Sequence, residues 1–373
     1  MKIKAAVVDK VNDPFVIKDD VELADVEDDG LQVKVVASGI CHSDEALRKG
    51  DAAFSFPVVL GHEGSGIVEK VGKNVKNFEV GDHIIMSFYS CGECDNCLRG
   101  IPTQCRKYAA SNLSGTRPDG SDHFTEDGHH VSDMFNQSSF TTHTVINKRN
   151  AVKVPKDLDL RKLGPLGCGY VTGSGTVFNT LQPKPGDTIA VFGTGAVGLA
   201  AMMAGKISGC VNVIAVDIVE SRLELAKKLG ATDVINSSKE DPVEAIKKIT
   251  GGLGVNWSVD TTGVSKVMMD SIGALTQGGT SATIAVTPHN IDLSTWNDLC
   301  VDDKKVVGVN MGDSIPQIDI PRLIKFYKMG MFPFDLTEKF FDFDQINEAD
   351  AESVSGETIK PVLIIDKDYQ PGK

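Results

Sequence analysis

The chain lacks an excess of positive charge. It holds 38 Lys and Arg against 51 Asp and Glu, which gives a formal net charge of −13 at pH 7. A protein with this balance is repelled by a nucleic-acid backbone and by an anionic membrane surface. We therefore expect neither nucleic acid nor membrane among its partners.

Long apolar runs are missing as well. The most apolar stretch, TIAVFGTGAVGLAAMMAG, is rich in glycine and is followed by Lys206, so it falls short of a membrane span. The first ten residues, MKIKAAVVDK, hold no apolar segment of the kind found in signal peptides. These features predict a soluble, cytoplasmic protein. In that compartment disulfides are rare, and clustered cysteines more often bind metal.

The length and the patterning predict two domains. A chain of 373 residues exceeds one ordinary core. Up to about residue 156, short strand-like runs alternate with Gly, Asp and Asn, which is typical of a β-barrel-like domain. The polar segment 111–136 shows no periodicity and is predicted to be a long loop. From residue 188 onward, six apolar strands alternate with helical patterns, which indicates a doubly wound parallel sheet.

Four of the eight cysteines follow the pattern C-x2-C-x2-C-x7-C, at Cys91, Cys94, Cys97 and Cys105. Four thiolates on one short loop are able to enclose zinc tetrahedrally. An iron–sulfur cluster is the main competitor, but the bacterial cluster motif has a shorter last gap and ends in Cys-Pro. Here Arg106 follows the last cysteine. The spacing favours structural zinc, with a cluster or unliganded thiols as alternatives, because a closed four-sulfur shell leaves no position for substrate.

Three further candidate residues lie on glycine-flanked loops, where functional groups concentrate. Cys41 stands in SGICHSDE, His62 in LGHEGSG and Cys168 in GPLGCGYV. Spacing alone cannot join residues so far apart in the chain. The remaining Cys210 and Cys300 are predicted to be small buried apolar residues.

The turn GTGAVG follows the first strand of the second domain and opens a helix, placing Gly193, Gly195 and Gly198 in a G-x-G-x-x-G motif. Such glycines allow a tight turn and a close approach of a pyrophosphate to the helix N-terminus. Asp217 ends the next strand. A carboxylate there accepts hydrogen bonds from the adenosine ribose and repels a 2′-phosphate, which favours NAD over NADP. Arg222 softens this preference without reversing it.

The chain resembles the zinc-dependent medium-chain alcohol dehydrogenases over nearly its whole length. The resemblance rests on GICHSD, LGHEGSGIVEKVG, CGECDNCLRG, LGCGYVTGSG, VFGTGAVGL and GETIKPVL. The segments NQSSFTTHTVINKRNAVKVP and LGPLGCGYVTGSGTVFNTL are most similar to the aryl- and benzyl-alcohol branch. The resemblance implies an α/β fold with a GroES-like β-barrel catalytic domain and a Rossmann domain. The implied boundaries are 1–169 with 314–373 for the catalytic domain and 170–313 for the NAD-binding domain.

The resemblance also joins the scattered residues. It implies that Cys41, His62 and Cys168 hold a catalytic zinc with its fourth position open to an alcohol oxygen. Glu63 matches a carboxylate that approaches the metal when the fourth ligand exchanges, and Asp44 matches the group that orients the imidazole. The four-cysteine loop matches the structural zinc of the family, so two zinc ions are expected in each chain.

Ser43 matches the hydroxyl that contacts the substrate oxygen and starts the proton exit. Many members carry a relay histidine at the position of Ala46. We therefore expect protons to leave Ser43 through ribose hydroxyls and water. The resemblance implies further cofactor contacts at His42, Thr172, Val197 and Lys360.

The substrate is predicted from the pocket position Ser87, where some members carry a bulky aromatic residue. A small side chain there makes room for a ring, so an aryl or allylic primary alcohol is expected. Phe88, Phe140 and Trp296 are either pocket or core residues. The alternatives are a general short-chain alcohol dehydrogenase, an S-(hydroxymethyl)glutathione/formaldehyde dehydrogenase, a polyol dehydrogenase and a non-catalytic zinc protein.

The segment KVVGVNMGD is predicted to end the second sheet. Family members pair such edge strands, so the resemblance implies a homo-oligomer, either a dimer or a tetramer.

Overall fold

The computed structural model describes residues 1–51 and 53–372, and the chain forms two compact units. The first unit comprises Met1–Cys168, Ile315–Arg322 and Asp335–Lys373, and the second comprises Gly169–Ser314 and Leu323–Phe334. Residues 323–334 therefore lie with the second unit, whereas the sequence-based boundaries assign them to the first.

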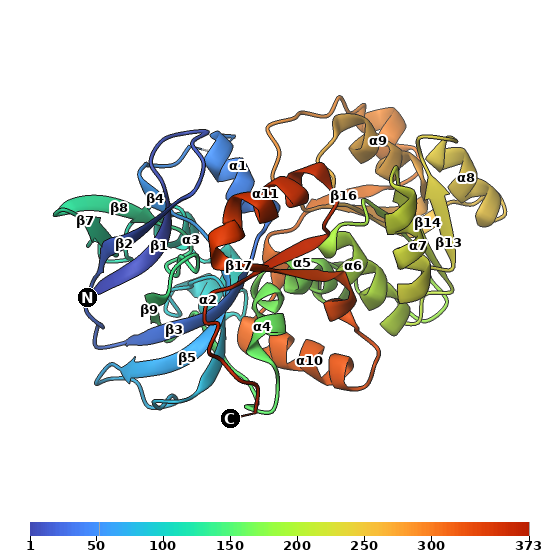
Figure 1. Ribbon diagram of the computed structural model, residues 1–373. Helices are drawn as coiled ribbons and strands as arrows, with labels where there is room; N and C mark the ends of the chain where they lie inside the picture. The colour runs from blue at the N-terminus through green and yellow to red at the C-terminus, as the bar shows by residue number, and fades with distance from the viewer. Residues whose placement is uncertain (52, 373) are drawn as a thin grey trace. The chain divides into compact units, whose positions relative to one another are not determined.

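The first unit begins with a small closed barrel. Strands far apart in the chain pair around it, as Figure 1 shows for β1, β2, β7 and β8. Alternate apolar side chains of these strands fill its interior, including Val7, Val21 and Phe124. The strands, in barrel order, are β1 (Lys2–Val8), β2 (Val16–Leu23), β7 (Phe124–Glu126), β8 (His129–Asp133) and β4 (Val58–Val59).

A second, seven-stranded sheet completes the core of this unit. Its longest strand, β3 (Gly30–Gly39), pairs with both β5 (Glu63–Val71) and β18 (Lys360–Ile364), so the C-terminal residues return to the N-terminal unit. The other strands are β10 (Ala151–Lys153), β6 (His83–Met86), β17 (Glu338–Asp342) and β9 (His143–Asn147). The helices of this unit are α1 (His42–Lys49), α2 (Asp95–Leu98), α3 (Tyr108–Asn112), α4 (Leu160–Leu163) and α11 (Ile346–Ser355).

Two sequence-based predictions are wrong here. Segment 111–136 is not one long loop, because β7 and β8 lie within it and close the barrel. Periodicity misses these strands because they are short and flanked by buried polar residues that bond one another, such as His123 and Asp133 at 3.1 Å. Of the two cysteines predicted to be buried, Cys300 is exposed and Cys210 is only partly buried.

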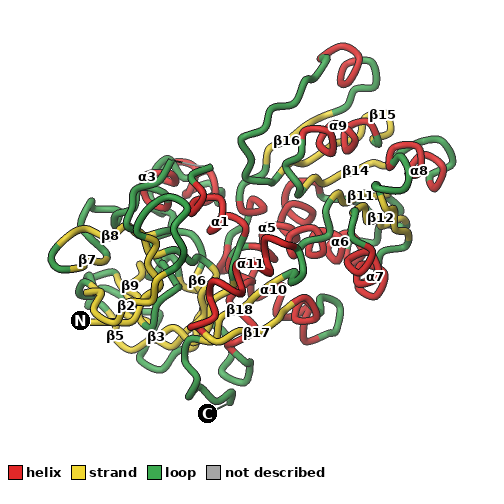
Figure 2. The backbone as a smooth tube through the Cα atoms, turned by 45° about the horizontal axis from the view of Figure 1, so that its top comes forward, coloured by secondary structure: helices red, strands yellow, loops and turns green. Residues whose placement is uncertain are grey.

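The second unit contains a six-stranded parallel sheet in the order β13-β12-β11-β14-β15-β16. This order confirms the predicted doubly wound sheet. Figure 2 shows helices α6 to α9 around these strands. The strands are β11 (Thr188–Phe192), β12 (Asn212–Asp217), β13 (Asp233–Asn236), β14 (Val255–Asp260), β15 (Leu275–Thr283) and β16 (Lys305–Gly308). The helices are α5 (Gly169–Gly175), α6 (Ala196–Ile207), α7 (Glu220–Leu229), α8 (Pro242–Ile249) and α9 (Ser265–Gly273), while α10 (Pro316–Lys328) runs from one unit into the other.

The apolar pattern of this unit explains its layers. β11 and β12 bury Ile189 to Phe192 and Val213 to Val216 almost completely, as strands covered on both faces do. α7 buries Leu223, Ala226 and Leu229 on one stripe, as its amphipathic sequence predicts. Within the described ranges, no helix is both long and apolar enough to cross a membrane.

A cluster of charges joins α1 to α11 in the first unit and carries a pH prediction. Asp350 is buried, and its Oδ2 lies 3.3 Å from Arg48 Nη2. Burial first, and then the charge of Glu45, raise the pKa of Asp350 to about 7 against the opposing charge of Arg48. Lys49 faces Glu45 at 2.7 Å, and Asp44 adds a smaller like charge.

The direction in which stability changes with pH follows from proton binding to Asp350. Below pH 7 the folded protein keeps a proton on Asp350 that the unfolded chain has released above about pH 4, so this group lowers stability as pH rises between these values. Asp350→Asn is expected to leave the Tm unchanged near pH 4 and to raise it at pH 8 by roughly 2–4 °C, which corresponds to about 1 kcal/mol. Thermal melts at both pH values test this, with Asp344→Asn, at an exposed position, as control. An equal gain at both pH values would contradict it.

Candidate active site and second metal centre

Three of the predicted site residues come together in the first unit. The ligand atoms of Cys41, His62 and Cys168 all lie within 4.8 Å of one another, and all three side chains are buried. Cys41 stands between β3 and α1, His62 directly precedes β5, and Cys168 follows a short helical turn over Gly164–Gly167. Residues that are distant in sequence are thus held at the ends of regular elements.

Asp44 orients the histidine of this cluster. Its Oδ1 lies 3.0 Å from His62 Nδ1 and accepts a hydrogen bond from Gly61 N at 2.9 Å. Its Oδ2 accepts from Cys41 N at 3.0 Å. The carboxylate therefore assigns the proton of His62 to Nδ1 and leaves the Nε2 lone pair free. Among the described residues, Nε2 has no hydrogen-bond partner although it is buried.

These residues fit a zinc ion. Two thiols and one imidazole with a free lone pair form a donor set that zinc prefers, and three protein ligands leave a fourth position for an exchangeable group. The pKa of Cys41 is held well below its ordinary value, chiefly by the hydrogen bond with Cys168 and, against the cost of burial, by nearby His62. The pKa of Cys168 is raised by the same hydrogen bond and by burial. One thiolate is therefore already favoured at this position.

A buried ion pair lies beside the cluster. Lys360 Nζ donates to both carboxylate oxygens of Glu63, at 3.0 and 2.8 Å, and to Ile40 O at 3.1 Å. Burial raises the pKa of Glu63 to about 7, although Lys360 opposes the rise. Burial alone would lower the pKa of Lys360, but the Glu63 carboxylate reverses this and raises it. The predicted contact between Lys360 and a cofactor pyrophosphate stays a prediction. In the structure, the Lys360 ammonium is paired with Glu63.

The start of α1 carries the remaining catalytic candidates. Ser43 Oγ lies 3.9 Å from Cys41 Sγ, so its hydroxyl faces the cluster. His42 is exposed on the same turn, whereas Ala46 is buried.

Two residues that the sequence left between pocket and core, Phe88 and Phe140, are fully buried. Phe88 packs on Tyr108, and Phe140 packs on Phe15. Trp296 is instead 68% exposed.

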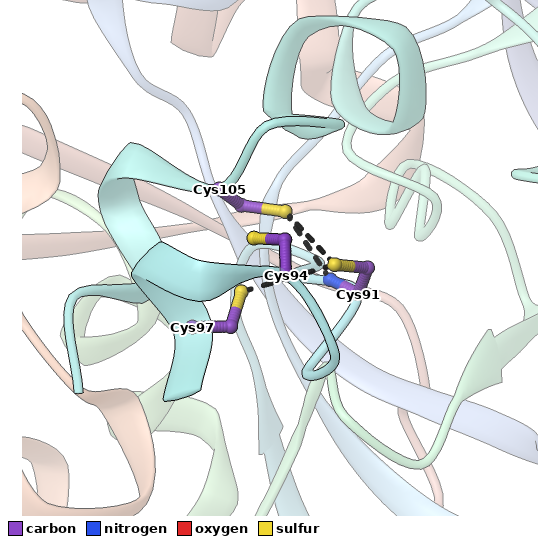
Figure 3. A group of neighbouring side chains, drawn as sticks. All are labelled: Cys91, Cys94, Cys97 and Cys105. Atoms are coloured by element: carbon purple, nitrogen blue, oxygen red, sulfur yellow. Dashed lines mark hydrogen bonds between the residues drawn. The ribbon is translucent and has the colours of Figure 1, made fainter. Parts of the chain in front are cut away.

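The second metal candidate is the four-cysteine loop. The sulfur atoms of Cys91, Cys94, Cys97 and Cys105 lie within 4.8 Å of one another and converge on one point in Figure 3, and all four thiols are free. Cys91 Sγ lies 3.9 Å from Cys97 Sγ and 3.5 Å from Cys105 Sγ. This arrangement fits a tetrahedral ion with about 2.3 Å metal–sulfur bonds.

A backbone N–H group favours the thiolate form of one of these cysteines, Cys94. Arg106 N donates to Cys94 Sγ at 3.5 Å and is the largest cause that lowers the pKa of Cys94 to about 6. Burial instead raises the pKa of Cys97 to about 12. The four-cysteine loop is also held by two hydrogen bonds that Arg106 donates to Asp95, both 3.0 Å.

The glycine turn in the second unit has the geometry of a dinucleotide site. Gly193 has φ 89°, which favours glycine, and a Cβ on Gly198 would lie 1.8 Å from the carbonyl oxygen of Gly193. Gly195 is the N-cap of α6, and Val197 lies in its first turn. Thr172 lies on α5, which packs against α6. The turn therefore brings its backbone N–H groups to a helix N-terminus, as phosphate binding requires.

Asp217 ends β12 beside this turn. Its Oδ2 accepts from N and Oγ1 of Thr194 at 2.7 and 2.6 Å, and its Oδ1 accepts from the next two backbone N–H groups at 2.7 and 3.0 Å. The carboxylate thus supports the glycine turn directly. Its contact with a ribose stays a prediction, as does the role of Arg222 on α7.

Sequence reasoning missed two buried amides near the first cluster, Gln137 and Asn150. Gln137 Nε2 donates to His62 O at 3.0 Å and to Ser87 O at 3.2 Å. Asn150 Nδ2 donates to Ser87 O at 2.9 Å and to Phe135 O at 3.0 Å. For Gln137 the available signal was the polar run NQSS between apolar residues, which predicts no particular contact.

Comparison with known proteins gives matches in both halves of the chain. Residues 27–156 match the alcohol dehydrogenase GroES-like domain, and residues 196–328 match the zinc-binding dehydrogenase family. The geraniol dehydrogenase of Castellaniella defragrans is 40% identical over 365 residues, covering 97% of each chain.

Two solved structures are similar to this chain over nearly its whole length. The benzyl alcohol dehydrogenase of Acinetobacter calcoaceticus has a TM-score of 0.94 at 41% identity, covering 98% of this chain and 100% of that one. A zinc-binding alcohol dehydrogenase domain protein from Burkholderia ambifaria has a TM-score of 0.95 at 41% identity, covering 98% and 99%. The predicted pairing of a GroES-like domain with a Rossmann domain is confirmed, and the chain belongs to the zinc-binding alcohol dehydrogenases.

Proposed function

We propose that this alcohol dehydrogenase oxidises primary alcohols, aryl or allylic ones first, to aldehydes with NAD, and that the reaction is reversible. The observation that carries the proposal is the buried Cys41, His62 and Cys168 cluster with a free Nε2 lone pair. The names of two relatives, a geraniol dehydrogenase and a benzyl alcohol dehydrogenase, support an allylic or aryl substrate.

Several residues of the chain have separate roles in the proposed reaction. Zinc, when bound by the cluster, supplies a Lewis acid that favours loss of the alcohol proton, and NAD supplies the hydride acceptor. Ser43 Oγ accepts the alcohol proton and passes its own proton on, so the hydroxyl is unchanged after the step. Asp44 holds the His62 ring in one tautomer and orientation throughout. Lys360 holds Glu63 in a buried ion pair beside the cluster.

We propose a second zinc at Cys91, Cys94, Cys97 and Cys105, with a structural role. Four sulfur ligands close the tetrahedron and leave no position for substrate.

We propose that NAD is preferred over NADP because Asp217 presents a carboxylate at the end of β12. That charge repels a 2′-phosphate. Cofactor contacts at His42, Thr172, Val197, Arg222 and Lys360 belong to the same proposal.

We also propose a cytoplasmic homo-oligomer. Among the described residues, β16 is the edge strand of the six-stranded sheet, so its outer side offers a surface for pairing with a second copy. Light scattering after size-exclusion chromatography distinguishes a monomer from a dimer or tetramer.

The activity is tested by initial rates of NAD reduction on metal-replete protein with benzyl alcohol, geraniol and ethanol. A kcat/KM that is highest for the two larger alcohols supports the proposal. A higher value for ethanol would assign a general short-chain alcohol dehydrogenase, and activity only with formaldehyde plus glutathione would assign the S-(hydroxymethyl)glutathione alternative. No turnover of any of these would overturn the proposed function.

A specificity prediction follows from Ser87, which is buried and donates through Oγ to Gly167 O at 2.6 Å. Ser87→Phe is expected to lower kcat/KM for benzyl alcohol by roughly 10–100-fold and kcat/KM for ethanol much less. The reason is that the introduced phenylalanine ring takes the space that the ring of benzyl alcohol needs. Ser87→Ala is the control, since it removes the hydrogen bond without adding bulk. Equal losses for both alcohols in Ser87→Phe would contradict the prediction.

A further inference from the structure

Gln137 connects a proposed zinc ligand to a proposed pocket residue. Its side chain is fully buried, and its single amide nitrogen donates to the carbonyl oxygens of His62 and Ser87. The orientation of the amide is unambiguous, because the flipped form would set Oε1 against two carbonyl oxygens. Both N–H bonds are therefore committed to main-chain acceptors.

The connection continues on both sides. Ser87 Oγ donates to the carbonyl oxygen of Gly167, the residue before Cys168. On the other side, Asp44 bonds the His62 ring and the backbone N–H of Cys41. A hydrogen-bonded chain thus runs from Cys41 through Asp44 and His62 to Gln137, Ser87 and the Cys168 segment. Gln137 is the link between the histidine and the second cysteine.

Gln137 is itself anchored by the sheet. Its carbonyl oxygen accepts a hydrogen bond from Thr144 Oγ1 on β9, and β9 pairs with the long strand β3. Both ends of the residue are therefore held. A rigid support of this kind restricts how far the His62 loop is able to move relative to Ser87.

We propose that Gln137 is a positioning residue that holds the His62 loop and the Ser87 segment in fixed register, and so controls retention of the catalytic metal. The inference rests on the proposed function, since it takes Cys41, His62 and Cys168 as metal ligands. It predicts that the loss of Gln137 loosens the metal at that cluster and spares the metal at the four-cysteine loop.

The test compares two variants that each lose two buried hydrogen bonds. Gln137→Met keeps the length of the side chain and removes its donors. Asn150→Leu removes the bonds to Ser87 O and Phe135 O and leaves the His62 carbonyl untouched. Both variants are loaded with zinc, and release of each ion to a chelator is followed by mass spectrometry.

Gln137→Met is expected to release the catalytic metal roughly 10–100-fold faster than wild type, and Asn150→Leu to stay within about threefold of it. Retention of the four-cysteine metal and an unchanged far-UV circular dichroism spectrum report intact folding. If Gln137→Met does not fold, Gln137→Asn replaces it, because its shorter amide keeps the donors and reaches only one carbonyl. Equal rates of catalytic-metal release from the Gln137 variant and from Asn150→Leu would overturn the inference.

A second readout separates this inference from the proposed function. In metal-free protein, amide hydrogen exchange over residues 58–66 is expected to rise in the Gln137 variant and not in Asn150→Leu. If the wild-type cluster binds no metal, the proposed function fails, and the exchange comparison alone decides the role of Gln137. If the cluster binds metal and exchange is the same in both variants, the inference fails while the function stands.

Discussion

His62→Ala is expected to lower kcat for alcohol oxidation by roughly a thousandfold, because removing a Lewis acid forfeits about 4 kcal/mol of transition-state stabilisation. The substitution deletes the only nitrogen donor of the cluster formed with Cys41 and Cys168. It also leaves the buried Asp44 carboxylate without its ring partner. Initial rates with benzyl alcohol and metal analysis of the same preparation measure both effects.

Metal content makes this prediction specific to one site. The variant is expected to lose one zinc ion per chain and to keep the ion of the four-cysteine loop. His143→Ala serves as the matched control, because His143 is a half-buried histidine on β9 that contacts Glu69 and not the cluster. Activity of His62→Ala within tenfold of wild type, or an equal loss of both ions, would show that this cluster is not the catalytic metal site.

The doubly wound sheet was predictable because its physical signals are local. Parallel strands covered on both faces read as continuous apolar runs, as β11 and β12 do. Gly193 has a positive φ, and Gly198 lies against the carbonyl oxygen of Gly193, so neither position has room for a side chain. The spacing of the glycines therefore predicts the turn. The four-cysteine loop was likewise readable, since all its ligands lie in one short segment.

The first cluster was not predictable from spacing, because it forms only when the sheet of the first unit assembles. Cys41 and Cys168 lie on segments separated by most of that unit, and only the family resemblance joined them. The barrel strands β7 and β8 pair with each other locally, but they are short, and their other partners, β2 and β4, are far away in the chain. Gln137 and Lys360 also take their roles from contacts with remote segments, which no local pattern encodes.

Cys97→Ser is expected to release the metal of the four-cysteine loop and to lower the Tm by about 10 °C, since zinc at a closed sulfur site contributes several kcal/mol directly to folding. The helix of this loop, α2, spans only Asp95–Leu98 and buries no residue. Its ion pairs, such as Arg106 with Asp95, lie at the surface, where each contributes about 0–1 kcal/mol.

Substitutions in the two candidate metal sites are expected to have opposite effects on kcat and on Tm. Cys97→Ser is expected to keep kcat within about threefold of wild type below its lowered Tm, because a closed sulfur shell has no substrate position. Limited proteolysis over residues 91–105 should accelerate, whereas Cys300→Ser, the same exchange at an exposed thiol outside both clusters, should change neither Tm nor cleavage. An unchanged Tm with a large fall in kcat would instead assign the chemistry to the four-cysteine loop and reverse the roles of the two centres.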